Sequence, residues 1–153
     1  MGSGGYSGGS QMKTTVLIGT LVAASTALAL DAPKRLTSND LSVETHKWDG
    51  KAIQVNAQCF YADTDEYRCA VLGANGVPGA GSFVRIDFGK ISPPEMKKAI
   101  EDNCDTLEKM PTRACRFQIV FTYSMYSRTE NNDGSELMTI MPEDFAGTFS
   151  KVR

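Results

Sequence analysis

The sequence predicts a mainly β fold with one helix and two disulfides. Five runs of residues alternate between apolar and polar side chains, which is the pattern of half-buried strands, and one further run repeats its apolar residues at helical spacing. Their order along the chain is three strands, one helix and two strands (β-β-β-α-β-β), without an internal repeat. Four cysteines supply the two bridges, and a length of 153 residues corresponds to one ordinary domain.

The first 29 residues are expected to lie outside that domain. Residues 1–11 are rich in Gly and Ser and are typical of a flexible leader or a start-site artefact. Residues 12–29 are typical of a signal peptide, because one basic residue precedes a short apolar stretch and small residues at its end predict cleavage after Ala29. A membrane anchor or a buried helix is the alternative. No cysteine follows the cleavage site, which disfavours a lipid anchor.

Export predicts the compartment and the net charge of the mature protein. The expected protein is periplasmic or secreted, with no membrane span after signal cleavage. Residues 30–153 keep 15 Lys and Arg against 18 Asp and Glu, which gives a formal charge of −3. Proteins that bind nucleic acid collect basic residues on one surface, so nucleic acid is not an expected partner. Residues 30–40 are expected to form an extended arm, and residues 41–153 a single domain.

Two alternating runs, residues 51–62 and 66–72, predict a β-hairpin around residue 64. Cys59 and Cys69 each lie five residues from that midpoint, so the hairpin places them opposite one another on one face. Sequence alone allows three pairings of four cysteines, and this register favours Cys59 with Cys69 and Cys104 with Cys115. The cysteine spacings match no zinc pattern, so no metal is expected there.

The remaining elements follow from capping and turn signals. A glycine-rich loop at 73–82 lacks the residues of a phosphate-binding loop and leads into a strand at 83–88. A helix is expected over 93–107, with Ser92 and Glu95 as a capping box. Its apolar face is expected to carry Met96, Ile100, Cys104 and Leu107. Strands are expected at 115–128 and 136–141, separated by a turn at 131–134 and with Pro142 ending the second.

This order of elements is that of an OB-fold, a five-stranded Greek-key barrel with a helix between the third and fourth strands. The chain resembles small exported bacterial OB-fold proteins, the tRNA-anticodon-binding-like group of periplasmic proteins of unknown role. The resemblance covers residues 41–141 and rests on Trp48-Asp49-Gly50-Lys51 before the first strand, the strand FVRIDF and the helix ISPPEMKKAI. It implies a binding module and no catalytic residues. A β-sandwich with a peripheral helix is the alternative fold.

The polar side of the first three strands is the predicted binding face. Aromatic and hydrogen-bonding side chains alternate there with the buried residues Val55, Val71 and Ile86, and Phe121 belongs to the same predicted core. OB-folds bind ligands on this side of the barrel. The alternative is that its two phenylalanines pack under a loop or the terminal arm. The candidate ligand-binding residues are Gln58, Phe60, Arg68, Phe83 and Arg85.

Three other groups of residues have simpler interpretations. His46 could act as a base with Asp49 or Glu44, but no nucleophile can be assigned to it, so a surface histidine is expected. The acidic turn of Asp63, Asp65 and Glu66 lacks the pattern of a calcium loop. Methionines could bind copper, but Met96 and Met125 fall in phase with core residues. No cofactor, metal or catalytic residue is therefore predicted.

The resulting functional prediction is a non-enzymatic binding module of the cell envelope. Its expected partner is an envelope protein, a peptide or a glycan. A secreted subunit or inhibitor that acts on a partner protein is one alternative, and a small hydrolase that uses His46 is the other.

Overall fold

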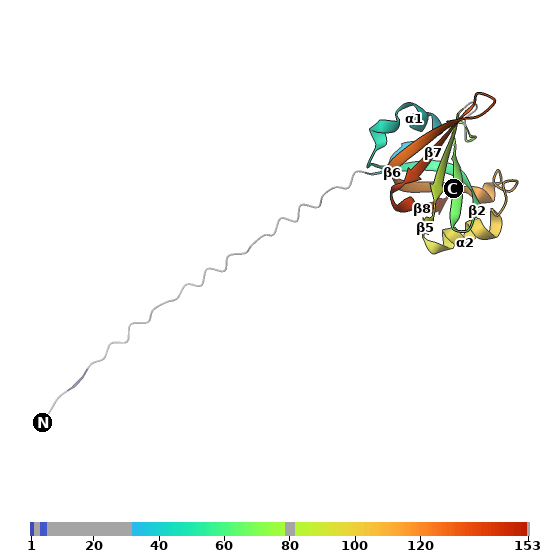
Figure 1. Ribbon diagram of the computed structural model, residues 1–153. Helices are drawn as coiled ribbons and strands as arrows, with labels where there is room; N and C mark the ends of the chain where they lie inside the picture. Colours follow the sequence, from blue (N-terminus) through green and yellow to red (C-terminus); the bar gives the residue numbers. More distant parts are fainter. Residues whose placement is uncertain (2–3, 6–31, 79–81, 153) are drawn as a thin grey trace. The chain divides into compact units, whose positions relative to one another are not determined.

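The computed structural model describes residues 1, 4–5, 32–78 and 82–152 (Figure 1). The chain divides into two units, Met1–Leu30 and Asp31–Arg153, and the second contains all helices and strands described below. The predicted signal peptide and the cleavage after Ala29 lie outside the described residues, as does most of the leader. None of the described helices is long and apolar enough to cross a membrane.

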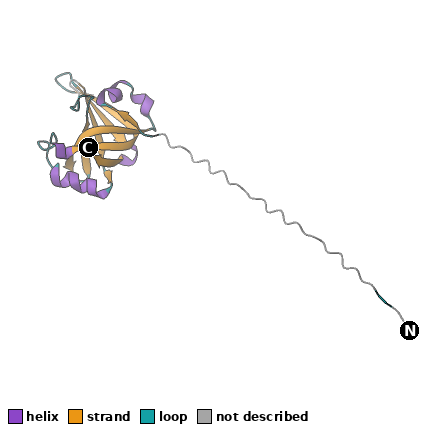
Figure 2. Cartoon of the chain, turned by 180° about the vertical axis from the view of Figure 1, so that it is seen from behind, coloured by secondary structure: helices purple, strands orange, loops and turns teal. Residues whose placement is uncertain are grey.

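The fold is mainly β sheet with few helices (Figure 2), and it holds two disulfides, as the sequence predicts. Eight strands form one mixed sheet, however, where five were expected. The strands are β1 (Lys34–Leu36), β2 (Ala52–Asp63), β3 (Glu66–Val71), β4 (Ser82–Phe88), β5 (Lys90–Ser92), β6 (Arg116–Glu130), β7 (Glu136–Pro142) and β8 (Ala146–Lys151). The helices are α1 (Ser38–Val43) and α2 (Pro94–Asn103), with the short 3₁₀ turns η1 (Thr45–Trp48), η2 (Arg113–Cys115) and η3 (Glu143–Phe145).

Five of the strands pair in a closed cycle. β2 pairs with β3, β3 with β4, β6 with β7 and β2 with β6, all antiparallel, and β4 pairs with β7 in parallel. β1 adds a parallel strand beside β2. β5 follows β4 after Gly89, β8 follows β7 after η3, and these two continuations pair with one another. Two of the three additional strands therefore prolong strands that the sequence predicts.

The interruption between β7 and β8 has a local cause. Asp144 and Phe145 adopt φ angles of 53° and 52°, in the left-handed region that side chains disfavour. Lys90 is four positions after Ile86, whereas its partner Ala146 is six positions after Ile140, the partner of Ile86, so the segment from β7 to β8 carries two extra residues. β7 ends at Pro142, as expected, and the chain forms a further strand, β8, after the turn η3.

The interior is filled by the residues that the alternation predicts. Val55, Val71 and Ile86 are fully buried and Phe121 is 4% exposed. Full burial of such side chains stabilises the fold by about 1.5–3 kcal/mol each. One position requires glycine: a Cβ on Gly147 would lie 2.7 Å from a ring carbon of Phe88.

Both disulfides have the predicted pairing. Cys59 lies directly opposite Cys69 in the β2–β3 ladder, with a Cα–Cα distance of 4.0 Å. Cys104 and Cys115 are 5.8 Å apart at Cα and join the end of α2 to the start of β6. All four cysteines are buried.

The helix prediction was too long. α2 ends at Asn103, because Cys104 leaves the helical conformation and its carbonyl accepts a hydrogen bond of 2.8 Å from the Tyr61 N–H of β2. Leu107 is consequently 65% exposed rather than on a helical core face. The predicted capping box is also wrong: Ser92 belongs to β5, and Pro93 occupies the N-cap position without a side-chain cap.

Two further expectations fail for local reasons. The segment expected to be an extended arm forms β1 and the start of α1, whose Thr37–Asp40 capping box the sequence analysis did not identify. Met125 was expected in the core, but it is 55% exposed. A shift of register between Tyr123 and Met125 in the β6–β7 pair changes the side on which the following residues lie.

Candidate functional site

Four of the five predicted ligand-binding residues line a single cavity of about 170 Å³ on the outward side of the sheet. The strand register explains this convergence, since Phe60 of β2 lies opposite Arg68 of β3, and Ala70 of β3 lies opposite Arg85 of β4. Phe60 and Phe83 are both partly buried. The lining residues are Phe60, Arg68, Ala70, Phe83, Arg85, Leu107 and Met110.

Leu107 and Met110 belong to a segment that folds back over this side of the sheet, residues 105–114, which we call the tethered loop. The Cys104–Cys115 disulfide closes its base. Gln58, the fifth predicted residue, does not line the cavity; its side-chain amide donates to the Pro111 carbonyl over 3.0 Å and is buried beneath the loop. The loop therefore contributes the outer wall of the cavity.

Sequence analysis missed both residues that the tethered loop supplies. Leu107 was assigned to the helix, and Met110 carries no local pattern. The usable signal was the disulfide itself: a bond between residues 104 and 115 forces the intervening segment to return towards the strands.

The two arginines of the cavity are each paired with a carboxylate on their own strand. Arg68 Nε donates to Glu66 over 2.7 Å, and an Arg85 terminal nitrogen donates to Asp87 over 3.0 Å. Arg85 Nε also lies 2.9 Å from Asp87, but without the alignment of a hydrogen bond. Asp87 in turn lies opposite Arg68 in the β3–β4 ladder. The four side chains sum to zero formal charge.

Burial determines how these groups titrate. It raises the pKa of the Asp87 carboxyl above its usual value, and the neighbouring Arg85 only partly opposes this effect. The hydrogen bond that Arg68 donates to the Glu66 carboxylate raises the pKa of Arg68, which therefore stays charged. A phosphate would have to displace carboxylates that are already in place, so this face is poorly suited to a polyanion.

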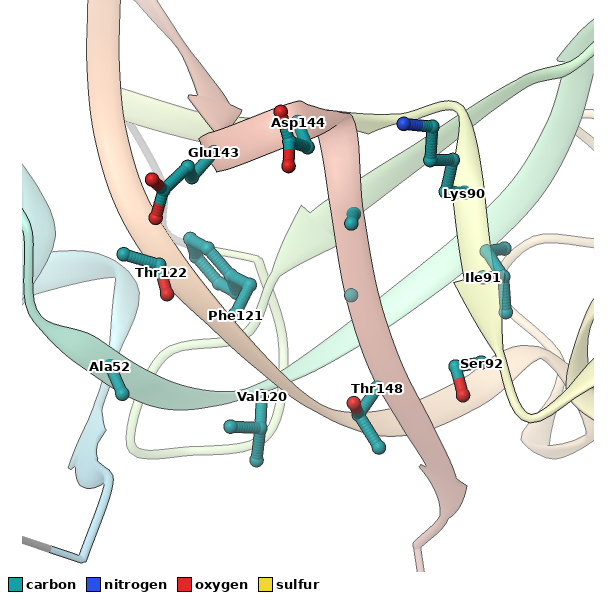
Figure 3. A pocket seen from close by; sticks show the side chains of 12 residues that line it. Ala52, Lys90, Ile91, Ser92, Val120, Phe121, Thr122, Glu143, Asp144 and Thr148 are labelled. Atoms are coloured by element: carbon teal, nitrogen blue, oxygen red, sulfur yellow. The ribbon is translucent and has the colours of Figure 1, made fainter. Parts of the chain in front are cut away.

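A second hollow of about 420 Å³ lies over β5, β6 and β8, beside the interruption at η3 (Figure 3). Glu143, Asp144 and Lys90 lie at one end of it, and Thr122 and Thr148 are among the other residues that line it. It contains none of the predicted site residues. Nothing in the sequence pattern indicated it, because it forms where the β7–β8 strand is interrupted.

The carboxylates of the acidic turn of the hairpin do not converge on one point. Asp63 accepts from the Thr64 N–H, Asp65 lies 3.4 Å from the Lys97 ammonium, and Glu66 pairs with Arg68. Within the described residues no group of three or more His, Cys, Asp or Glu side chains could hold a metal ion.

His46 lies on the surface, with its side chain 83% exposed. Its Nδ1 lies 4.0 Å from the Asp49 carboxylate, and its Nε2 lies 3.3 Å from the Tyr126 hydroxyl. All four cysteines are in disulfides. In the described part of the chain, neither a serine nor a thiol is hydrogen-bonded to this imidazole.

No family model, no curated protein and no solved structure matches the chain, and so its function has to be argued from the geometry of these surfaces.

Proposed function

We propose that the chain is an exported, non-enzymatic binding module that holds a partner protein or peptide through one apolar side chain. The cavity between the two phenylalanines and the tethered loop is the observation that carries this proposal. It specifies the type of barrel, the cellular compartment of the protein and the kind of ligand that the cavity holds.

The barrel is a five-stranded, OB-fold-like Greek-key barrel. The closed cycle β2–β3–β4–β7–β6 supports it, as does the position of α2 between β4 and β6 in the chain. One parallel pair among antiparallel pairs, between β4 and β7, the third and fifth of these five strands in chain order, is consistent with the same topology. In such barrels the outward side of the second and third strands binds ligands, and those strands here are β3 and β4.

The compartment is the periplasm or the exterior of the cell. Two disulfides support this, since such bonds persist in oxidising compartments and are rare in the cytosol. The predicted signal peptide at residues 12–29 points the same way.

The size and chemistry of the cavity favour a single side chain as its occupant. Pockets for small organic ligands measure about 300–1,000 Å³, whereas this cavity measures about 170 Å³. An apolar cavity of roughly 150 Å³ holds a benzene ring. Leu107, which is 65% exposed, extends the apolar surface beyond the cavity. One aromatic or branched aliphatic side chain of a partner would therefore fit, with the arginines at its rim available to backbone carbonyls.

The experiment is a selection of random peptides, displayed on phage, against the purified protein with both disulfides intact. We expect enriched peptides to share one large apolar residue. Leu107→Ala should weaken their binding about tenfold or more, while the melting midpoint stays unchanged because the side chain is exposed. Val43→Ala is the matched control, since Val43 is an 81% exposed apolar residue of α1 outside the cavity. Failure to enrich any peptide, or equal binding by the Leu107→Ala variant, would contradict the proposal.

A further inference from the structure

The outward side of β2, β6 and β8 carries a row of polar side chains that the proposed function does not use. Asn56 of β2 lies opposite Gln118 of β6, and Gln118 lies opposite Ser150 of β8. Directly opposed residues in antiparallel strands have Cβ atoms about 4.5–5.5 Å apart. Two amides and a hydroxyl therefore stand side by side across three strands.

This row forms the floor of a hollow of about 480 Å³. A neighbouring hollow of about 280 Å³ meets it at Arg35 and Asn56, which line both. None of the described residues that line either hollow is acidic. In a chain with more carboxylates than basic groups, this is an unusually cationic recess. The described residues around the larger hollow are Arg35, Asn56, Gln118, Ser150, Lys151 and Val152.

The cations at this end are held by the fold. The Lys151 ammonium donates to the Ala114 carbonyl over 2.5 Å and lies 4.2 Å from the centre of the Phe117 ring. Arg35 sits in β1, which is paired in register with β2. The Asn56 side-chain oxygen is buried and has no hydrogen-bond partner among the described residues. Arg35 and Lys151 thus both line a hollow whose described lining residues include no carboxylate.

The same outward side continues into the hollow of Figure 3. Val120 and Thr122 follow Gln118 at every second position of β6, and Thr148 lies opposite Val120. We call the whole surface, from Arg35 and Lys151 to Thr122 and Thr148, the polar trough. Its β6 and β8 side chains are an amide, hydroxyls and Val120, whereas Ile91 and Phe121 also line the hollow of Figure 3 and the carboxylates of Glu143 and Asp144 lie at that end, away from Arg35.

We propose that the polar trough binds a linear oligosaccharide that carries a carboxylate, with the acidic group at the Arg35 and Lys151 end. Amide and hydroxyl side chains both donate and accept hydrogen bonds, which matches neighbouring sugar hydroxyls. A peptide strand would need a free sheet edge, but β6 is paired on both sides at Gln118. Charge complementarity selects an acidic sugar over a neutral one.

The test uses the trimer of galacturonic acid and its methyl ester, which keeps the remaining hydroxyls but removes the charge. Amide NMR titrations of the purified protein at low salt should show the acid trimer binding at about millimolar dissociation constant or tighter, with shifts at Asn56, Gln118 and Ser150. The ester should bind about tenfold more weakly. Arg35→Gln should bring the acid-to-ester ratio close to one, and Gln118→Leu should weaken both sugars. Arg113→Gln, at an exposed arginine of η2, should change neither.

The acid-to-ester ratio is measured within each variant, so a change in folding cannot imitate the expected result. Equal binding of acid and ester to the unmodified protein would overturn the inference. So would the absence of shifts at about 10 mM sugar, or binding of a polyglutamate peptide at the same residues when the sugar does not bind. Leu107→Ala should leave sugar binding unchanged, because the cavity under the tethered loop is a separate surface.

Discussion

The two disulfides close segments of nearly equal length and yet stabilise different parts of the molecule. Cys59 and Cys69 are 10 residues apart and lie within a strand ladder, where backbone pairing already fixes their register. Cys104 and Cys115 are 11 residues apart and enclose a segment without strands. The chain-entropy model assigns each about 2–3 kcal/mol. The first therefore adds stability to an existing structure, whereas the second positions a wall of the candidate binding site.

The largest expected effect concerns the region of the first disulfide. Ile86 lies opposite Cys69 in the β3–β4 ladder and is fully buried, so Ile86→Ala removes core contacts and leaves a cavity. We expect it to lower the free energy of unfolding by about 2–5 kcal/mol, measured by urea denaturation. Met110→Ala, in the tethered loop, should cost less because Met110 packs on the outward side. A larger loss of unfolding free energy for Met110→Ala than for Ile86→Ala would contradict the assignment of Ile86 to the core and of Met110 to the outward side.

Removing each disulfide in turn separates stability from site geometry. Cys59→Ala with Cys69→Ala, and Cys104→Ala with Cys115→Ala, should each lower the free energy of unfolding by about 2–3 kcal/mol. Only the second pair should raise the rate of amide hydrogen exchange in residues 105–114, because only that bond closes the loop. Equal exchange in the two variants would show that the loop does not need its disulfide.

The polar anchor of the tethered loop should have a smaller effect. Gln58→Met keeps the length of the side chain but removes the hydrogen bond to the Pro111 carbonyl. Net contributions of such bonds are about 0.5–1.5 kcal/mol. We expect a loss of that size in unfolding free energy and faster exchange in the loop, with the hairpin amides unaffected. Equally increased exchange in the hairpin would indicate that Gln58 stabilises β2 itself.

A still smaller effect is expected in the pKa values of two carboxyls, Asp87 on the binding face and Asp133 in a solvent-exposed turn. The pKa of Asp87 should lie above its usual value because of burial, and that of Asp133 below it because Ser135 hydrogen-bonds its carboxylate. As the pH falls through the folded pKa of Asp87, its carboxylate is protonated and the cost of burying that charge in the native state is removed. As the pH falls through the folded pKa of Asp133, the stabilisation from its hydrogen-bonded carboxylate is lost. Carboxyl-carbon NMR titration measures both. Shifts in the same direction would contradict the burial of Asp87.

The sequence predicted the features that depend on local alternation. The hairpin register follows from a strict period of two and correctly pairs Cys59 with Cys69. The same rule failed at Met125, because a bulge in β6 cannot be seen in one strand without its partner. The helix end and the position of Leu107 depend on a long-range contact, the hydrogen bond from the Tyr61 N–H to the Cys104 carbonyl, which local periodicity does not contain.

Short strands were missed for a related reason. β1 and β5 have three residues each, too few to show alternation, and they exist because β2 and β8 offer them a partner. For the candidate site, the residues on strands were predictable and those on the tethered loop were not. The polar trough was missed because it joins residues from four strands, β1, β2, β6 and β8, that only the sheet topology brings together.

If the tethered loop completes a cavity for one apolar side chain, toluene should bind in that cavity, so this ligand tests the site without knowledge of the partner. Methyl and amide NMR spectra should show toluene shifting Leu107, Met110 and Phe83 in the unmodified protein and in the Cys59→Ala, Cys69→Ala variant. The Cys104→Ala, Cys115→Ala variant should lose these shifts while remaining folded, because the outer wall of the cavity is no longer held in place. Unchanged toluene shifts in that variant, or none in the unmodified protein, would contradict the claim.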